Sequence, residues 1–187
     1  FRQDVDVTRY NTWAELQDYC RRSANPVGRL VLRISGRDDA QLDAWSDDIC
    51  TALQRTNFWQ DVTKDYERGR VYLPREEQRL HGAREEDLAA GRITPAWQEA
   101  LSAAVLRTRG LFEASRPLCD AMRGRLRYEL RATWLGGTRI LDRLARDHFD
   151  VVNRRPTLGV LDAPWFAWRM LVWTGPRAPL AYGPRSS

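Results

Sequence analysis

Cysteine, histidine and lysine are scarce in this chain of 187 residues. The three cysteines, Cys20, Cys50 and Cys119, lie far apart without CxxC spacing, which supports neither a disulfide framework nor a zinc site. Isolated thiols of this kind are typical of a reducing compartment. No apolar run approaches the roughly 18 to 20 residues of a membrane span, and no signal peptide is visible. Because the chain starts at Phe1 without a methionine, we expect a fragment that lacks its N-terminal part.

Lysine occurs once, as Lys64, so arginine supplies almost all of the basic charge. The chain carries 30 basic and 25 acidic residues, a net charge of +5, and nine arginines against four acids fall between residues 121 and 155. Because acids are interleaved in this segment and no glycine-rich or aromatic RNA motif accompanies it, we expect no nucleic-acid partner. A basic face toward an anionic lipid surface or a diphosphate is the interpretation that we favour.

Helical patterns dominate the rest of the sequence. A hydrophobic content of 43% with eight tryptophans predicts a folded protein, and 187 residues is the length of one domain. No pair of strands and no internal repeat is recognisable, so the predicted fold class is all-α. We expect residues 1–174 to form one helical domain, and residues 175–187, with three prolines and no periodic apolar pattern, to form a disordered tail.

Capping and breaking residues define the predicted helices. Thr12 and Glu15 have the spacing of a capping box and start the first helix, and Pro26 predicts a kink in it near Asn25. The glycine pair at 136–137 either bends a later helix or allows close packing against a neighbour, and close packing is our default. The predicted helices cover residues 13–35, 39–67, 96–114, 118–152 and 165–173.

The helix predicted for residues 39–67 carries Asn57, Asp61 and Asp65 at positions i, i+4 and i+8. Side chains at this spacing lie about 6 Å apart on one face, so the two carboxylates repel each other unless a cation lies between them. Hard oxygen ligands with room for water suit Mg²⁺ that carries a phosphate or diphosphate. The alternative is a solvated helix with surface aspartates.

We call Asn57, Asp61 and Asp65 the acidic ladder, and apolar side chains surround it. A helix that is apolar nearly all round is usually buried, and buried carboxylates need partners, which favours the metal site. A wall that is apolar at one end and acidic at the other suits a ligand with a long apolar tail and an anionic head. The apolar residues are Leu42, Ile49, Cys50 and Leu53 on the face of the ladder, and Trp45, Phe58 and Trp59 on the other sides.

Two long motifs carry a resemblance to a known family. Residues 57–65, NFWQDVTKD, followed by residues 69–74, GRVYLP, resemble the second aspartate-rich motif of the squalene/phytoene synthases, the head-to-head prenyl transferases. Residues 19–28, YCRRSANPVG, resemble another segment of the same family, one helix earlier. The resemblance runs from about residue 9 to residue 173. It implies the C-terminal portion of a terpenoid-synthase-type helical bundle.

The resemblance implies a Mg²⁺-dependent enzyme that acts on a prenyl diphosphate. Asn57, Asp61 and Asp65 match the metal-binding motif of the family. Without the resemblance, Tyr19 and Tyr72 would be interpreted as packed core tyrosines. The implied catalytic residues are Tyr19, Tyr72 and Asn25, and the implied substrate-binding residues are Arg70, Gln54, Ala24, Val27, Gly28 and Leu53.

The sequence departs from the family pattern at three places, and the third place resembles one branch of the family. Gln60 stands where many members carry arginine, which removes one diphosphate contact, and Lys64 stands where an acid is common. Residues 23–26, SANP, replace the Ala-Gly of the squalene and phytoene synthases themselves and resemble the bacterial hopanoid-pathway branch. Members of that branch that resemble this chain are hydroxysqualene synthases, which convert presqualene diphosphate to hydroxysqualene by letting water capture a cation. We hypothesise that Asn25 helps to admit or hold that water.

Other activities stay open. The substrate would be presqualene or farnesyl diphosphate, and squalene, presqualene diphosphate or phytoene synthesis are the alternative reactions. No second DxxxD motif of the right kind precedes Tyr19, so we expect the 187 residues alone to be weakly active or inactive. The alternative of another class is a non-catalytic relative that serves as an assembly or lipid-binding partner. We expect a cytoplasmic protein, and the tryptophan-rich helix at 165–173 either lies on the bundle or contacts the inner membrane peripherally.

Overall fold

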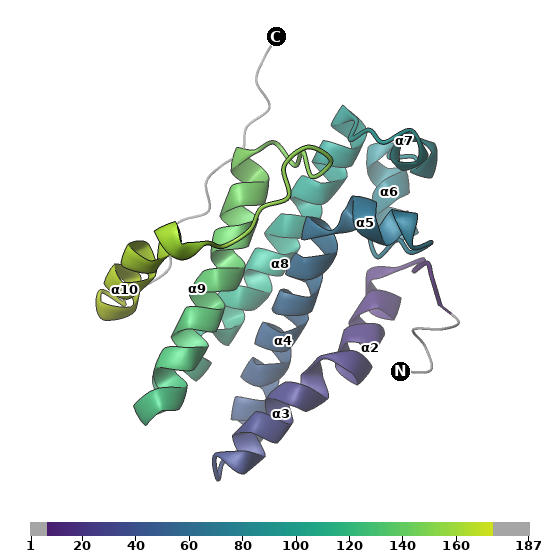
Figure 1. Ribbon diagram of the computed structural model, residues 1–187. Helices are drawn as coiled ribbons and strands as arrows, with labels where there is room; N and C mark the ends of the chain where they lie inside the picture. Colours follow the sequence, from purple (N-terminus) through teal and green to yellow (C-terminus); the bar gives the residue numbers. More distant parts are fainter. Residues whose placement is uncertain (1–6, 174–187) are drawn as a thin grey trace.

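The computed structural model describes residues 7–173, which form a bundle of helices (Figure 1). Over this range no strand is present, and a parallel bridge between Arg9 and Val71 is the one strand-like pairing. The all-α prediction is therefore confirmed, whereas the tail predicted for residues 175–187 lies outside the described residues. The elements are α2 (Trp13–Ser23), α3 (Asn25–Ile34), α4 (Ala40–Gln60), α5 (Val62–Glu67), α6 (Arg75–His81), α7 (Glu85–Ala89), α8 (Pro95–Ala121), α9 (Gly124–Arg146), the 3₁₀ turn η1 (Val160–Asp162) and α10 (Ala163–Leu171).

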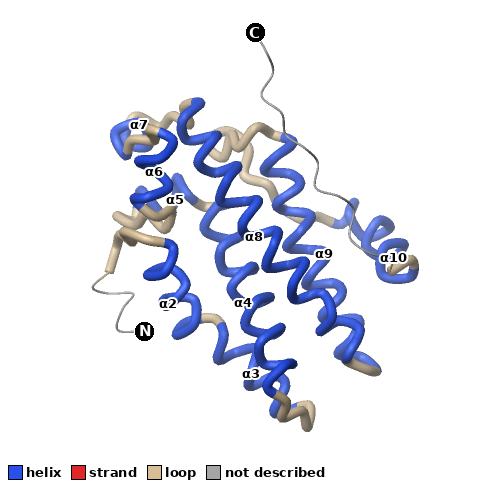
Figure 2. Tube along the Cα trace, turned by 180° about the vertical axis from the view of Figure 1, so that it is seen from behind, coloured by secondary structure: helices blue, strands red, loops and turns tan. Residues whose placement is uncertain are grey.

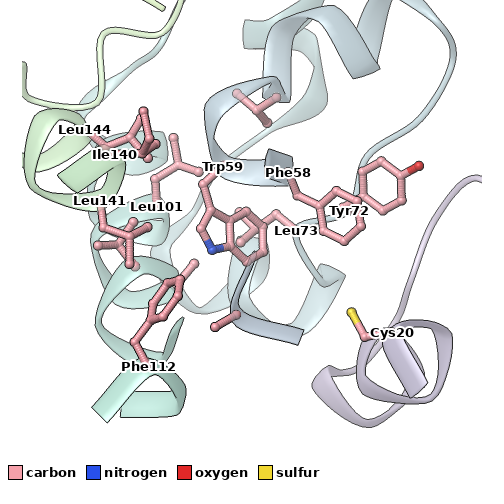
Figure 3. Packing of buried hydrophobic residues seen from close by; sticks show 14 of the residues in the cluster. Cys20, Phe58, Trp59, Tyr72, Leu73, Leu101, Phe112, Ile140, Leu141 and Leu144 are labelled. Atoms are coloured by element: carbon pink, nitrogen blue, oxygen red, sulfur yellow. The ribbon is translucent and has the colours of Figure 1, made fainter. Parts of the chain in front are cut away.

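Helix α4 lies in the middle of the bundle, with α2 and α3 on one side and α8 and α9 on the other (Figure 2). Its Trp59 is fully buried, and the indole Nε1 donates a hydrogen bond of 2.8 Å to Oγ1 of Thr108 on α8. Burying a large apolar side chain contributes about 2 to 3 kcal/mol, so Trp59 alone holds α4 firmly against its neighbours. Figure 3 shows its ring surrounded by apolar side chains that include Leu101, Phe112 and Leu141.

The first helix is broken where the sequence predicts a kink. Helix α2 ends at Ser23 and α3 begins at Asn25, with Pro26 in the first turn of α3, where its missing N–H costs no helical hydrogen bond. At the other end of α2, Oγ1 of Thr12 accepts a hydrogen bond of 3.2 Å from the N–H of Glu15, as the capping box predicts. Sequence signals within a single helical turn were sufficient to predict both the break near Asn25 and the cap at Thr12.

The helix that carries the acidic ladder is broken at Asp61, so the prediction of one helix over residues 39–67 is wrong. The backbone of Asp61 has φ −112° and ψ 19°, outside the helical range, although its N–H still donates to the carbonyl oxygen of Asn57 at 2.9 Å. Asn57 thus lies on α4, Asp61 at the junction and Asp65 on α5. Gly69, with φ +78°, stands just after α5 and lets the chain turn, as predicted.

Helix boundaries in the second half of the chain also differ from the prediction. Helix α8 continues through Pro117 to Ala121, whereas the sequence predicts an end at residue 114. Proline removes one helical hydrogen bond, and the helix tolerates this loss because the following Leu118 and Cys119 are buried in the core. The turn is made instead by Gly124, with φ +62°, at the start of α9, which ends at Arg146 and not at residue 152.

The glycine pair at 136–137 serves helix packing. Helix α9 runs through both residues without interruption. A Cβ atom on Gly137 would lie 2.2 Å from Cζ of the buried Phe112 on α8, which shows that the aromatic ring occupies the space of a side chain. The default prediction of close helix packing is confirmed.

Candidate functional site

Two carboxylates of the acidic ladder lie close together at the end of α4. Asp65 is half-buried, and burial raises the pKa of its carboxyl to about 6, with the negative charge of Asp61 as the second cause. The positive charges of Arg68 and Arg70 act in the opposite direction. The repulsion predicted from the i, i+4 spacing is thus present across the α4–α5 junction.

Tyr72 and Tyr19 extend this acidic group toward the core. The ring of Tyr72 stacks on Phe58 with centroids 3.7 Å apart and planes 6° apart (Figure 3). The centroid of the Tyr72 ring lies 5.9 Å from that of Tyr19. Burial raises the pKa of the Tyr72 hydroxyl, and the negative charge of Asp65 raises it further. Arg70 and the Tyr19 hydroxyl act in the opposite direction by charge and hydrogen bonding. Asp65, Arg70, Tyr72 and Tyr19 therefore form one contiguous set.

Arg155 is a member of the site that the sequence does not reveal. Its Nε and Nη2 donate to Oδ1 and Oδ2 of Asp61 at 2.5 and 2.8 Å, and these bonds hold the pKa of Asp61 below its usual range. The residue lies in the segment after α9, 94 positions from its partner. The arginine excess between residues 121 and 155 was the available signal, but it does not identify one arginine.

The segment around Arg155 is attached to the helices on both sides. Gln60, buried at the end of α4, donates from Nε2 to the carbonyl oxygen of Pro156, and Arg143 on α9 donates to the carbonyl oxygen of Thr157. Gln60 stands where many family members carry arginine, and here its amide binds the protein's own backbone. The glutamine at position 60 therefore has a structural consequence, because its hydrogen bond to Pro156 holds the neighbouring Arg155 beside Asp61.

A cavity of about 530 Å³ opens between α4, α9 and residues 155–158. Two of the predicted residues, Leu53 and Asn57, lie on its wall, and Arg155 lies at its rim. Most of the other lining groups are small or apolar, so the space suits an apolar chain next to the acidic and basic groups. The remaining lining residues are Thr56, Gln60, Ala132, Thr133, Gly136, Gly137, Ile140, Thr157 and Leu158.

The predicted residues around the α2–α3 junction lie apart from this cavity wall. Asn25 is 2% exposed, and its Oδ1 accepts a hydrogen bond of 3.0 Å from Oγ1 of Thr51 on α4. Gly28 provides room for α4, because a Cβ atom there would lie 2.5 Å from Sγ of Cys50. Among the described residues, the cavity wall includes neither these two nor three other predicted ligands, which are Ala24, Val27 and Gln54.

The donors present fit a hydrated magnesium ion. Asp61 and Asp65 would supply hard carboxylate oxygens and Asn57 an amide oxygen, and the negative charge of Asp61 is the second cause, after burial, of the raised pKa of Asp65. Within residues 7–173, no group of three or more His, Cys, Asp or Glu side chains could hold a metal ion. Mg²⁺ usually keeps several waters, so two carboxylates and an amide are a sufficient protein contribution, provided that Asp61 exchanges Arg155 for the metal.

The fold and the site define a class of protein. A helical bundle brings carboxylates, arginines and tyrosines together at the end of α4, and Arg155 connects Asp61 of this group to the wall of a largely apolar cavity, an arrangement that suits a ligand with an anionic head and a long apolar tail. The family model of squalene/phytoene synthase matches residues 1–162, and the chain belongs to this family.

Similar proteins within the family carry three different enzyme names. A hydroxysqualene synthase from Rhodopseudomonas palustris is 43% identical over 119 residues, which is 63% of this chain and 40% of that protein. A phytoene synthase from Thermus thermophilus is 36% identical over 159 residues, 84% of this chain and 54% of that protein. The crystal structure of squalene synthase HpnC from Alicyclobacillus acidocaldarius has a TM-score of 0.76 and 40% identity, covering 79% of this chain and 56% of that one. The chain spans about half the length of the relatives that it matches.

Proposed function

We propose that this protein converts presqualene diphosphate and water to hydroxysqualene and diphosphate. The observation that carries the proposal is the contiguous set of Asp61, Asp65, Arg70, Tyr72 and Tyr19, which the bond from Asp61 to Arg155 connects to the wall of a largely apolar cavity. Identities of 40 to 43% with hydroxysqualene synthases support this reaction over others of the family. The family's known syntheses all begin with an anionic leaving group on an apolar chain, which is the chemistry that the set can serve.

The first step is the loss of diphosphate. The carbon–oxygen bond to the diphosphate breaks, and the electron pair leaves with the diphosphate oxygen. In this proposal Asp61, Asp65 and Asn57 hold Mg²⁺, which supplies the charge that stabilises the leaving group. Arg70, whose charge already acts on Asp65 and Tyr72, donates hydrogen bonds to the diphosphate oxygens.

The second step is the rearrangement and capture of the carbocation. Tyr19 and Tyr72 line the region of the cation, where their ring faces attract positive charge. Leu53 in the cavity wall keeps the apolar chain away from bulk water. One water oxygen then forms a new carbon–oxygen bond and releases a proton. We propose that Asn25 helps to hold this water through its amide N–H groups, since its Oδ1 already accepts from Thr51.

The remaining assignments are part of the same proposal. Ala24, Val27, Gly28 and Gln54 would contact the substrate at the α2–α3 junction and along α4. No helix within residues 7–173 has the length and apolar character of a membrane span. Peripheral contact with a membrane also belongs to the proposal, because prenyl chains partition into bilayers. Squalene, presqualene diphosphate or phytoene synthesis is the alternative reaction, and a phytoene synthase at 36% identity keeps it open.

The test is an activity assay on the protein as the cell makes it. Presqualene diphosphate and farnesyl diphosphate are offered separately with Mg²⁺ in water enriched in ¹⁸O, and the products are identified by mass spectrometry. We expect hydroxysqualene from presqualene diphosphate, with one ¹⁸O incorporated. Asp61→Asn should lower kcat by about a hundredfold or more, in the range seen when one electrostatic contact to a leaving group is lost.

A matched control is Asp18→Asn, which removes the same charge from a surface ion pair with Arg21 and Arg22. This variant should keep the activity of the parent. Squalene or presqualene diphosphate as the product from farnesyl diphosphate would keep the family and overturn the reaction. Absence of turnover with both substrates would favour a non-catalytic relative with an assembly or lipid-binding role.

A further inference from the structure

Tyr10 lies against both tyrosines of the candidate site. The centroid of its ring is 5.5 Å from that of Tyr19 and 5.9 Å from that of Tyr72, and the last two centroids are themselves 5.9 Å apart. Aromatic rings attract each other at these separations. We call Tyr10, Tyr19 and Tyr72 the tyrosine triangle. The sequence implies two of its members for the site, and the structure adds Tyr10.

The tyrosine triangle is buried, and Tyr10 is its most enclosed member. Tyr10 is 2% exposed, Tyr19 6% and Tyr72 9%. Phe58 on α4 completes the packing, because it stacks on Tyr72 and its ring centroid lies 6.1 Å from that of Tyr19. Side chains in a close-packed interior do not move independently of one another. Since Tyr10 offers almost no surface to a ligand, any influence that it has on the reaction acts through Tyr19 and Tyr72.

The backbone around Tyr10 is held by the segment that follows α5. Figure 1 shows the start of the described chain, in purple, beside this segment, and Arg9 and Val71 form a parallel bridge there. The N–H of Val71 donates to the carbonyl oxygen of Thr8 at 3.0 Å, and the N–H of Arg75 donates to that of Tyr10 at 2.9 Å. These bonds lie on either side of Tyr72 in the sequence, so they fix Tyr10 and Tyr72 relative to each other.

Arg9 provides a second attachment. Its Nη1 donates to the carbonyl oxygen of Gly69 at 2.6 Å, and its Nε and Nη2 donate to the carboxylate of Glu85 on α7 at 2.9 and 2.8 Å. Pairing of one guanidinium with both oxygens of a carboxylate restricts the geometry as well as adding energy. Successive side chains of an extended segment point to opposite sides, so the attachment of Arg9 also determines the direction of Tyr10.

The two site tyrosines come from different parts of the chain. Tyr19 lies on α2, whereas Tyr72 lies between α5 and α6. Their side chains share a hydrogen bond, which fixes the separation of two oxygens and leaves each ring free to rotate about it. A ring attracts a cation through its face, so the direction of the face matters. Tyr10 contacts both rings and can fix both directions at once.

We propose that Tyr10 is a positioning residue, whose ring orients Tyr19 and Tyr72 toward the carbocation. The inference deepens the proposed function and rests on the roles that it gives to these two tyrosines. The carbocation exists only after the substrate has bound, and the proposed diphosphate contacts come from Arg70 and the acidic ladder. Loss of the Tyr10 ring should therefore lower kcat and leave KM nearly unchanged.

The kinetic test uses the protein as the cell makes it, with presqualene diphosphate and Mg²⁺. Tyr10→Leu should lower kcat about tenfold or more, because small misplacements of reacting groups are costly, and should change KM less than about twofold. Tyr10→Phe keeps the ring and should retain kcat within about twofold. The control Leu118→Ala removes a 1% exposed side chain near the end of α8 and should retain kcat, so a general loss of core packing does not reproduce the effect.

A second measurement needs no substrate. In NMR spectra with labelled tyrosines, we expect cross-relaxation between the ring protons of Tyr10 and those of Tyr19 and Tyr72, because the centroid separations bring the ring edges into contact. The cross-peaks between Tyr19 and Tyr72 should weaken in Tyr10→Leu and persist in Leu118→Ala. Absence of turnover in the parent counts against the proposed reaction alone, and the cross-peaks then decide whether Tyr10 orients the two rings.

Several results would overturn the proposal. These are an unchanged kcat in Tyr10→Leu, a raised KM with unchanged kcat, an equal loss of kcat in the Leu118→Ala control, or missing cross-peaks in the unmodified chain. An equal loss in Tyr10→Phe and Tyr10→Leu would assign the effect to the hydroxyl and not to the ring. Circular dichroism checks that each variant is folded. If Tyr10→Leu does not fold, Tyr10→Met takes its place, since methionine fills irregular space without a ring.

Discussion

Arg155 donates hydrogen bonds to both carboxylate oxygens of Asp61, at 2.5 and 2.8 Å, although the two residues are 94 positions apart in the sequence. A bidentate pair of this kind gives Asp61 the cation that the acidic ladder calls for, without a metal. If Asp61 is a ligand of Mg²⁺, the metal and Arg155 compete for the same oxygens. This competition can be measured.

Replacing Arg155 should strengthen magnesium binding. The Arg155 side chain is 37% exposed, and pairs near the surface contribute about 0.5 to 1 kcal/mol, so Arg155→Gln should bind Mg²⁺ about two- to fivefold more tightly in titration calorimetry. Arg154→Gln removes the same charge one position earlier and should leave the affinity unchanged. Equal affinities of Arg155→Gln and the parent would show that Asp61 is not a ligand of the ion.

Asp65→Asn should stabilise the protein at neutral pH and not at acidic pH. Since the folded-state pKa of Asp65 is raised to about 6, the native state binds more protons than the unfolded state between about pH 4 and 6, and stability falls as pH rises through this window. A shift of this size corresponds to about 3 kcal/mol, which we discount to about 1 kcal/mol because the carboxylate is only half-buried. Thermal denaturation from pH 4 to 8 measures the difference.

The control for this experiment has the opposite sign. The pKa of Asp18 is lowered, chiefly by the hydrogen bond from Arg21, so Asp18→Asn should give no stabilisation at pH 7. An Asp65→Asn variant that is no more stable than the parent at pH 7 would contradict the raised pKa of Asp65, which comes first from burial and then from the charge of Asp61.

Gly137→Ala should destabilise the protein. The new Cβ would lie 2.2 Å from Cζ of Phe112, and overpacking of this kind costs about 1 to 3 kcal/mol in urea denaturation. Gly110→Ala is the matched control on α8, because no atom lies within 4 Å of its added Cβ and alanine favours the helix by about 1 kcal/mol. Equal effects of the two substitutions would mean that α8 and α9 do not approach each other as described.

Thr51→Val should loosen the junction between α2 and α3. Valine has nearly the shape of threonine but cannot donate to Oδ1 of Asn25, and a buried acceptor without a partner costs about 1 to 3 kcal/mol. Urea denaturation measures this loss, and Thr8→Val, at an exposed position, should change the unfolding free energy by less than about 0.5 kcal/mol. A Thr51→Val variant as stable as the parent would show that this hydrogen bond does not hold the junction together.

Features with a local cause could be predicted from the sequence. Thr12 caps α2, Pro26 marks the start of α3 and Gly69 follows α5, because each acts through the conformation or hydrogen bonds of its own turn. The acidic ladder and the two site tyrosines were likewise recognisable, since their spacing is local and the family motif is long. The structure brings Asp61, Asp65 and Tyr72 together as the motif implies.

Features with a distant cause could not be predicted. The break at Asp61 has neither glycine nor proline at that position, and it coincides with a bond to Arg155 that lies 94 positions away. Helix α8 passes Pro117 because the residues after it are buried against other helices, which local propensity does not include. In both places the tertiary structure determines the backbone.

The attachment of residues 155–156 to the end of α4 has a consequence for synthesis on the ribosome. Gln60 and Asp61 are synthesised before their partners Pro156 and Arg155, which follow more than ninety positions later. At about 5 to 20 residues per second, Asp61 waits at least several seconds for its arginine. During this interval a nascent chain holds an unpaired acidic cluster, so a divalent cation can reach Asp61 before Arg155 does.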